Sequence, residues 1–365
     1  MKKIVLLIAL SMLACAHPVW TQENVFQFKT LKLKNTKGSI SGVIEIGNFP
    51  LLVSKNKRFA EKINTFLQVE ELETILGTKA VTSGLASVTT SLASVSWEVL
   101  QTPGNILSIS FAMEGCGAYC DNYDAYANFD TRTGDMILLR HLLTKEGFEV
   151  MNRKVKANKK ATIRLFMKET REKLAKSVSK DDRELYKEQL FLYETCNTHD
   201  IDDDAGFYFT ENNIVITSSR CSAHVVRAID DLGTFSFAHE IEEMEKYLSP
   251  YGVSLLKGGQ FVKNASIGGK MFKGTIGKYP VTALLTRVQG DNSFSMWYWY
   301  EKHMTLIAWS GKMHNGKTLT MTERDVKGDY KIVASIYAEI KDGGIQGVWK
   351  NSITGEKLSL NLVEY

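Results

Sequence analysis

The sequence has little net charge and no second long apolar segment. After the first 16 residues, no stretch approaches the about 20 apolar residues that a membrane-spanning helix needs. The formal net charge is +4, from 45 basic and 41 acidic side chains. A balance this close to neutral gives no indication of nucleic-acid binding. We therefore expect no transmembrane segment in the mature chain and no nucleic-acid partner.

The sequence also lacks recognisable catalytic motifs. His239 begins a segment similar to a zinc-protease helix, but Glu243 stands where the second histidine is needed. The histidines His141, His199 and His224 are not surrounded by a nucleophile elbow or another catalytic arrangement. We predict a protein without catalytic residues and without a cofactor.

The N-terminus predicts export. A short basic start is followed by an apolar run at residues 4–13 and then by Ala14-Cys15-Ala16, which fits signal-peptide cleavage. This pattern predicts a signal peptide of residues 1–16. Residues 12–15 also loosely resemble a lipoprotein box, in which Cys15 would be acylated. Both routes place the protein outside the cytoplasm: periplasmic, secreted or lipid-anchored at the cell envelope.

The cysteines fit an oxidising compartment. Four remain after processing: Cys116, Cys120, Cys196 and Cys221. Four thiols in such a compartment predict two disulfides with three possible connectivities. Spacing favours Cys116–Cys120 and Cys196–Cys221 but leaves the crossed pairings open. Metal binding is the rival use, although the paired C-x-x-C spacing of zinc sites is missing.

The chain divides near residue 258. Residues 17–258 mix strands and helices, which predicts an α+β domain built on an antiparallel sheet. The expected helices are residues 56–76, 147–177, 181–193 and 239–248, and the clearest strands are residues 92–100, 106–113, 123–129, 207–209 and 214–216. In the helix of residues 147–177, the lysine run Lys154, Lys156, Lys159 and Lys160 has two interpretations, a patch for a polyanion or a solvated helix face. Acidic residues nearby favour the solvated face.

Residues 259–365 predict an all-β domain. Eight alternating segments follow one another, separated by turn sequences such as Asn315-Gly316 and Asp342-Gly343. Short connections force neighbouring strands to pair antiparallel, and closing the meander removes its exposed edges. We expect an eight-stranded up-and-down meander or barrel, either filled by side chains or able to hold one small ligand.

Several motifs of the first part resemble a known exported family. They are residues 97–111, the loop of residues 114–120, the turn of residues 128–134 and the hairpin that begins Phe207-Tyr208-Phe209-Thr210. The family includes the extracytoplasmic domain of a lysozyme-sensing anti-sigma factor and the accessory domain of peptidoglycan deacetylases. The resemblance covers about residues 25–250. Tyr119 departs from it, since the family pattern has a histidine there. The C-terminal strands are loosely similar to lipocalin- or avidin-type barrels.

The resemblance implies a binding or sensing protein of the cell envelope. Its partner would be a protein, such as a lysozyme-like hydrolase, or a cell-wall glycan. The loop residues Gly117, Ala118 and Tyr119 are then candidate contacts, because a disulfide-stapled loop offers a rigid surface. The deacetylase chemistry of the family belongs to a separate attached domain that nothing in this chain resembles.

An aromatic ribbon suggests an alternative function. Alternation places Trp297 and Trp299 on one face of a strand, and Tyr298 and Tyr300 on the other. If the barrel were hollow, these side chains would suit an apolar ligand or a sugar. The protein would then be a small-ligand carrier, whereas a filled barrel would use the same residues as core.

Two further hypotheses concern acidic residues. Asp200, Asp202 and Asp204 alternate as in a calcium loop, but Ala205 occupies the position that needs glycine, so a solvated acidic loop is the stronger interpretation.

A third functional hypothesis, after the binding protein and the ligand carrier, is a cell-wall-modifying enzyme. It predicts a cleft with converging carboxylates or histidines of perturbed pKa.

Overall fold

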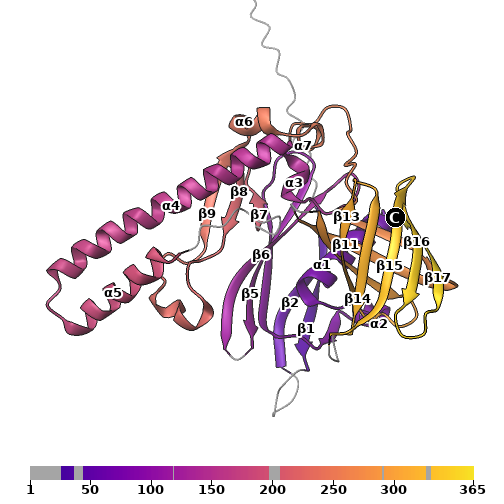
Figure 1. The fold of residues 1–365 in the computed structure, drawn as a ribbon, viewed down its shortest axis with the longest axis horizontal. Helices are drawn as coiled ribbons and strands as arrows, with labels where there is room; N and C mark the ends of the chain where they lie inside the picture. Colours follow the sequence, from indigo (N-terminus) through magenta and orange to yellow (C-terminus); the bar gives the residue numbers. More distant parts are fainter. Residues whose placement is uncertain (1–25, 37–43, 118, 197–205, 290–291, 326–329) are drawn as a thin grey trace, which may run out of the picture.

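The computed structural model describes residues 26–36, 44–117, 119–196, 206–289, 292–325 and 330–365. It contains an α+β region followed by a closed eight-stranded antiparallel barrel, which confirms the predicted fold class (Figure 1). The expected signal peptide and Cys15 lie outside the described residues. Among the described residues, no helix combines the length and apolar composition that crossing a bilayer requires.

A six-stranded sheet forms the centre of the α+β region, in the order β3-β1-β2-β4-β5-β6. β1 pairs with β3, and β2 with β4, in parallel; the other neighbours are antiparallel. The sheet is therefore mixed and not antiparallel throughout as predicted, because the helical connection of residues 57–83 allows parallel pairing. The strands are β1 (Gln27–Asn35), β2 (Ile44–Val53), β3 (Leu85–Val88), β4 (Leu92–Leu100), β5 (Ile106–Cys116) and β6 (Cys120–Asp130).

Helix α1 (Lys57–Leu72) packs against this sheet. Its N-terminus is capped by the Asn56 side chain, which accepts a hydrogen bond from the main-chain N–H of Phe59. Ile63, Phe66 and Leu67 are completely buried in the core that the helix shares with the sheet. The helix ends at residue 72, not at residue 76 as the periodicity suggested, because Glu73 adopts the left-handed conformation (φ 48°). A short helix, α2 (Thr78–Ser83), follows.

A second, three-stranded antiparallel sheet lies beside the first. It consists of β7 (Phe207–Phe209), β8 (Asn213–Ser218) and β9 (Phe235–Glu240). The expected helix of residues 239–248 is wrong at its start, because His239 pairs with Ile214 and extends β9. Short helical pieces complete this layer: α3 (Leu139–Leu142), η1 (His224–Ile229), α6 (Ile241–Met244), η2 (Glu245–Tyr247) and α7 (Pro250–Leu256).

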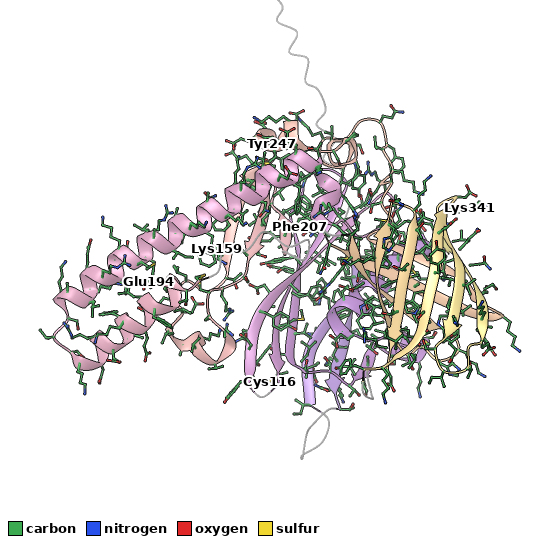
Figure 2. All side chains as sticks on the ribbon, in the orientation of Figure 1. Cys116, Lys159, Glu194, Phe207, Tyr247 and Lys341 are labelled. Carbon is green, nitrogen blue, oxygen red and sulfur yellow. A yellow bond between two sulfur atoms is a disulfide. The ribbon has the colours of Figure 1, made fainter. Side chains whose placement is uncertain are left out.

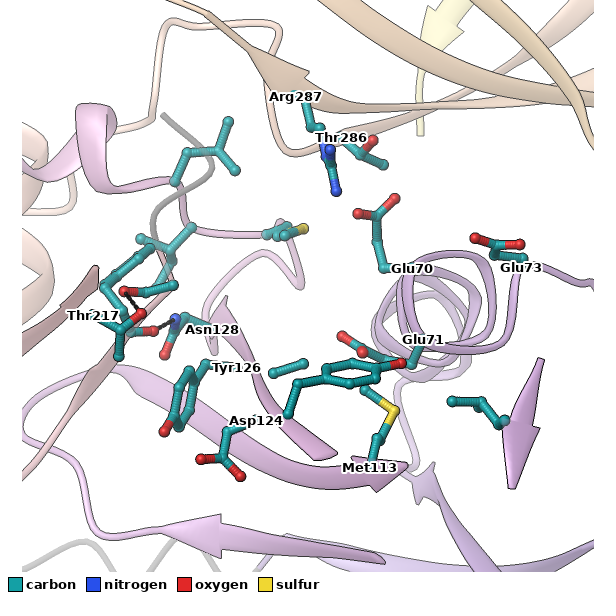
Figure 3. A pocket seen from close by; sticks show the side chains of 18 of the residues that line it. Glu70, Glu71, Glu73, Met113, Asp124, Tyr126, Asn128, Thr217, Thr286 and Arg287 are labelled. Carbon is teal, nitrogen blue, oxygen red and sulfur yellow. Dashed lines mark hydrogen bonds between the residues drawn. The ribbon is translucent and has the colours of Figure 1, made fainter. Parts of the chain in front are cut away.

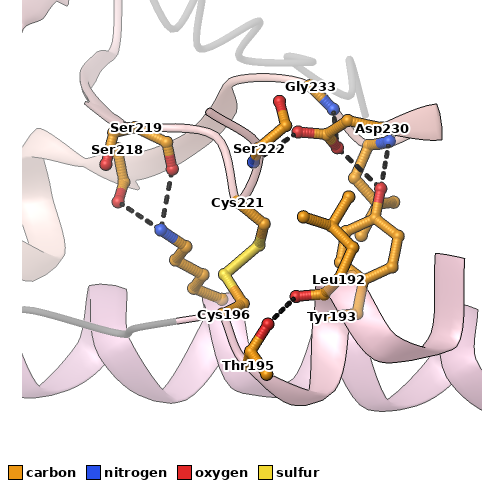
Figure 4. The surroundings of a disulfide bond; sticks show 12 residues. Leu192, Tyr193, Thr195, Cys196, Ser218, Ser219, Cys221, Ser222, Asp230 and Gly233 are labelled. Atoms are coloured by element: carbon orange, nitrogen blue, oxygen red, sulfur yellow. Dashed lines mark hydrogen bonds between the residues drawn. A yellow bond between two sulfur atoms is a disulfide. The ribbon is translucent and has the colours of Figure 1, made fainter. Parts of the chain in front are cut away.

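Helices α4 (Lys145–Lys176) and α5 (Lys180–Glu194) form an arm that extends from the body (Figure 1). Thr144 and Ser179 cap their N-termini. The 32 residues of α4 span about 48 Å at 1.5 Å per residue. The Cys196–Cys221 disulfide ties the base of the arm to the segment that follows β8 (Figure 4).

The barrel strands pair in sequence order, and β10 pairs with β17 to close the cylinder. Asn315-Gly316 and Asp342-Gly343, predicted as hairpin turns, have the positive φ angles that such turns require. The strands are β10 (Lys270–Ile276), β11 (Tyr279–Val288), β12 (Ser293–Tyr300), β13 (Ile307–His314), β14 (Thr318–Arg324), β15 (Ile332–Lys341), β16 (Gly344–Asn351) and β17 (Lys357–Glu364).

The two faces of β12 have different surroundings. Met296 and Tyr298 point into the barrel and are buried in its core. Trp299 lies on the outer face and is buried, 5% exposed, in the core that the six-stranded sheet and α1 form. Met271 and Leu284 of the barrel join the same core. The aromatic ribbon therefore fills the barrel and also attaches it to the rest of the protein.

We predict that Trp299→Ala lowers the free energy of unfolding by about 3 to 5 kcal/mol, because it removes a large buried side chain between the barrel and α1. The matched control is Tyr337→Ala on an exposed outer surface of the barrel, where the side chain is 59% exposed and a change within about 0.5 kcal/mol is expected. Urea titration measures both. Equal effects of the two substitutions would contradict the assigned interface.

Candidate functional site

A cavity of about 380 Å³ lies where α1, β6, the second sheet and the barrel meet. Figure 3 shows α1 on one side, β6 below, and Thr286 and Arg287 from β11 above. Among its lining residues are four acidic side chains, Glu70, Glu71, Glu73 and Asp124. We call this cavity the acidic pocket.

The end of α1 supplies three of the four carboxyl groups. Glu70 and Glu71 belong to the last turn of the helix, and Glu73 is its left-handed C-cap. The C-terminus of a helix carries partial negative charge, so acidic side chains there are unfavourable. The last turn of α1 contains no basic residue to offset them. The sequence thus concentrates negative charge where helix stability alone would avoid it.

Glu71 is the most strongly perturbed of these groups. Removal from solvent, followed by the negative charge of Glu70, raises its pKa from 4.5 to about 8. Glu71 is therefore mostly protonated at pH 7. Desolvation and the charges of Glu71 and Glu73 also raise the pKa of Tyr123, which lines the same pocket.

Strand β6 forms a rigid floor. The Asn128 amide donates to the carbonyl oxygen of Phe207 at 2.7 Å and accepts from the Ser108 hydroxyl at 2.7 Å. The Tyr126 ring stacks on Tyr208, with centroids 4.5 Å apart. Burial and the neighbouring Asp124 raise the pKa of Tyr126 to about 12. These contacts hold the floor in place without help from a ligand.

β6 is also the edge strand of the six-stranded sheet. The main-chain carbonyl of Asn128 accepts a hydrogen bond from the main-chain N–H of Ile137 at 2.7 Å. The main-chain carbonyl of Asn122 accepts one from the Arg227 guanidinium at 3.2 Å. Both bonds lie on the side away from β5. Main-chain groups alternate along a strand, so those of Asp124 and Tyr126 face the same side. The pocket therefore combines carboxyl groups with a strand edge that pairs with none of the described strands at these positions.

The barrel closes the pocket through Thr286 and Arg287. The pairing of β11 with β12 shifts between Leu285 and Arg287, and such a bulge redirects the side chains beside it. In Figure 3 the Arg287 side chain points toward Glu70. Among the described lining residues, Arg287 is the one basic side chain beside four acidic ones, so this lining is predominantly acidic.

The predicted loop candidates lie elsewhere. The disulfide Cys116–Cys120 closes the tip of the β5–β6 hairpin, as spacing favoured. Figure 2 marks Cys116 at this tip and Phe207 well away from it. Tyr119 is 69% exposed there, Gly117 lies next to Cys116, and Ala118 lies outside the described residues. The tip is an exposed, stapled loop, but it does not line the acidic pocket.

The predicted aromatic candidates Trp297, Trp299, Tyr298 and Tyr300 are packed rather than open to solvent. The Tyr298 hydroxyl donates to a Glu323 carboxyl oxygen at 2.8 Å, and the Trp309 and Trp349 indole N–H groups donate to the same oxygen at 3.1 and 3.2 Å. Sequence reasoning missed Glu323. Its only signal is that alternation along β14 places it on the inward face with Leu319 and Met321.

A metal site receives no support from the described residues. The calcium-loop candidates Asp200, Asp202 and Asp204 lie outside them. Within the described ranges, three potential metal ligands converge at Glu114, Cys116 and Cys120. The two cysteines form a disulfide, so they offer no thiolate to a metal.

The acidic pocket was not predicted from the sequence either. Its signal was the acidic sequence Glu70-Glu71-Leu72-Glu73 at the end of a helical pattern. Asp124 and Arg287 join these residues only through the tertiary fold. These residues are far apart in the sequence, so their arrangement around the pocket could not be recognised from it.

Comparison with solved structures finds distant structural neighbours. A member of the DUF3298 family from Bacteroides fragilis is 12% identical, with a TM-score of 0.39 over 64% of this chain and 98% of that one. No family model and no curated protein matches the sequence. A likeness at this level carries no argument about function.

We predict that Glu71→Gln makes the protein more stable than wild type at high pH, and that the two proteins have nearly equal stability at pH 5. Folded Glu71 keeps its proton until about pH 8, whereas the unfolded group loses it near 4.5, so wild-type stability falls as pH rises between these values. The advantage of the variant grows by about 1.4 kcal/mol per pH unit across that window, to a few kcal/mol.

Thermal unfolding from pH 5 to 9 measures this difference. Glu188→Gln on α5 is the control, because Glu188 is exposed. Parallel stability curves for wild type and Glu71→Gln would show that the carboxyl titrates normally.

Proposed function

We propose that the protein is an exported recognition protein of the cell envelope that binds a partner without chemically changing it. The observation that carries the proposal is the acidic pocket beside the outer edge of β6, which no other described strand covers. Its lining holds four carboxyl groups, of which Glu73 and Asp124 are exposed, and this acidic lining favours a partner that presents a positively charged group. The rigid floor beneath them suits binding of a preformed surface.

A basic protein such as a lysozyme-like hydrolase fits this chemistry best. The resemblance of residues 25–250 to the extracytoplasmic domain of a lysozyme-sensing anti-sigma factor supports the same class of partner. An extended basic segment could pair with the edge of β6 while its side chains meet Asp124 and Glu73. A cell-wall glycan is the alternative partner, held by carboxyl and tyrosine side chains.

Export is supported by the two disulfides, because disulfides persist mainly in oxidising compartments. We propose cleavage after residue 16, or acylation of Cys15, and a division of the mature chain between residues 258 and 259. Intact-mass measurement of the secreted protein is expected to show a chain beginning at His17 with four oxidised cysteines. A chain that retains Met1 and free thiols would contradict export.

An enzyme that acts on the cell wall is the second candidate. A protonated Glu71 next to other carboxyl groups resembles the acid–base pair that glycan hydrolysis requires. Turnover of peptidoglycan by the purified protein, abolished by Glu71→Gln, would replace the binding proposal with this one. We expect no turnover.

The carrier alternative has less support. The barrel interior contains tightly buried side chains, among them Phe272, Tyr298, Trp309, Leu319 and Leu360. An apolar ligand of the barrel would have to displace them.

We predict that the double variant Glu73→Gln/Asp124→Asn binds a purified lysozyme about tenfold more weakly than wild type, because two exposed carboxylates of the pocket lose their charge, a loss of about 1.4 kcal/mol. Glu339→Gln/Glu356→Gln on the barrel is the control with an equal charge change. Biolayer interferometry at low salt measures the affinities. If the pocket variant binds lysozyme with unchanged affinity, the pocket is excluded as the contact surface. If wild type binds no basic envelope protein and no glycan, the proposed function is excluded.

A further inference from the structure

The outer surface of α4 carries a row of basic side chains that the proposed function does not use. Between residues 150 and 168 the helix has seven lysines and arginines and no acidic residue. The surrounding chain is nearly balanced, with 45 basic and 41 acidic residues overall. Positive charge is therefore concentrated on one segment of the arm.

Helical geometry aligns four of these residues. At about 100° per residue, Arg153, Lys160, Arg164 and Lys168 fall within an arc of about 80°, and they extend over about 22 Å along the axis. All four are exposed. We call this row the α4 ridge.

One lysine of this segment, Lys159, is not part of the ridge and has a structural role. Lys159 is 3% exposed and points inward, where its ammonium group donates to the carbonyl of Ser219 at 2.7 Å and lies over the Phe235 ring. The expectation that the whole lysine run forms a solvated face is wrong at this position. Lys159 helps attach the arm to the second sheet, and the ridge points the other way.

The charge of the ridge is not neutralised within the described residues. None of its four side chains forms a salt bridge there, whereas Arg171, farther along α4, pairs with Glu194 of α5 at 3.0 Å. Four like charges at spacings of about 6 to 10 Å repel one another and contribute nothing to packing. An anionic ligand would remove this repulsion.

We propose that the α4 ridge binds an extended polyanion, a flexible chain of repeated phosphate groups outside the cytoplasm. The row is narrow and straight, and it lies on an arm that projects from the body (Figure 1). Ala157 lies between the cations in the same arc and Ala161 lies about 20° beyond it, so no large apolar side chain is available there for membrane insertion. Leu165 is exposed but lies about 100° around the helix from the centre of the ridge and about 60° from Lys168. The geometry thus favours a charged chain over a lipid surface.

The test measures binding of long-chain inorganic polyphosphate to the full oxidised protein by fluorescence anisotropy. Wild type is expected to bind at low salt, with a slope of log K against log salt of about −3 for four charge contacts. The ridge variant Arg153→Gln/Lys160→Gln/Arg164→Gln/Lys168→Gln is expected to lose at least tenfold in affinity. Glutamine preserves helix propensity, so the arm is expected to remain folded.

The matched control, Lys173→Gln/Lys176→Gln/Lys180→Gln/Lys187→Gln, removes the same charge from the same arm away from the ridge, and it is expected to bind within about twofold of wild type. Equal losses in the two variants would overturn the proposal, because net charge alone would explain the binding. Binding to phosphatidylglycerol vesicles but not to polyphosphate would also overturn it in favour of a membrane surface. Two half-ridge variants, Arg153→Gln/Lys160→Gln and Arg164→Gln/Lys168→Gln, replace the quadruple variant if circular dichroism shows that it unfolds.

Discussion

The packing of the barrel against α1 is the constraint on which the rest of the structure depends. Three side chains of the barrel are buried in the core that α1 shares with the six-stranded sheet: Met271, Leu284 and Trp299. Around this apolar contact, Lys273 of β10 pairs with Glu61 of α1 at 2.6 Å, and the Tyr365 hydroxyl donates to the same carboxyl group. The contact fixes β11 opposite the end of α1. Without it, Thr286 and Arg287 would not close the acidic pocket.

Two carboxyl groups in the molecule show that the fold surrounds desolvated acids in different ways. Glu323 receives three hydrogen bonds from Tyr298, Trp309 and Trp349, so its desolvation is offset inside the barrel. Glu71 is desolvated beside another acid at a helix C-terminus, and its pKa rises to about 8. A protein selected for stability alone would not place three acids there, and such local conflicts are typical of functional sites. The contrast supports a role for the pocket in recognition.

The sequence predicted the features that depend on local periodicity. Strand alternation and turns such as Asn315-Gly316 indicated the barrel, and the helical pattern indicated α1, α4 and α5. It failed where tertiary contacts override local preference. His239 joins a strand because β8 offers a partner, and Lys159 turns inward because Ser219 accepts its hydrogen bond. The acidic pocket could not be predicted, because it unites residues from three distant parts of the chain.

The central claim is that the pocket contains a desolvated carboxyl group, that of Glu71, and that a cationic partner binds beside it. The direct measurement is the ionisation of Glu71 in the intact protein, followed by NMR of the ¹³C-labelled side-chain carboxyl as pH is raised, with Glu71→Gln to assign the signal. The account predicts a midpoint near pH 8, which falls toward the ordinary value when a basic partner is bound. A midpoint near 4.5 in the free protein would contradict it.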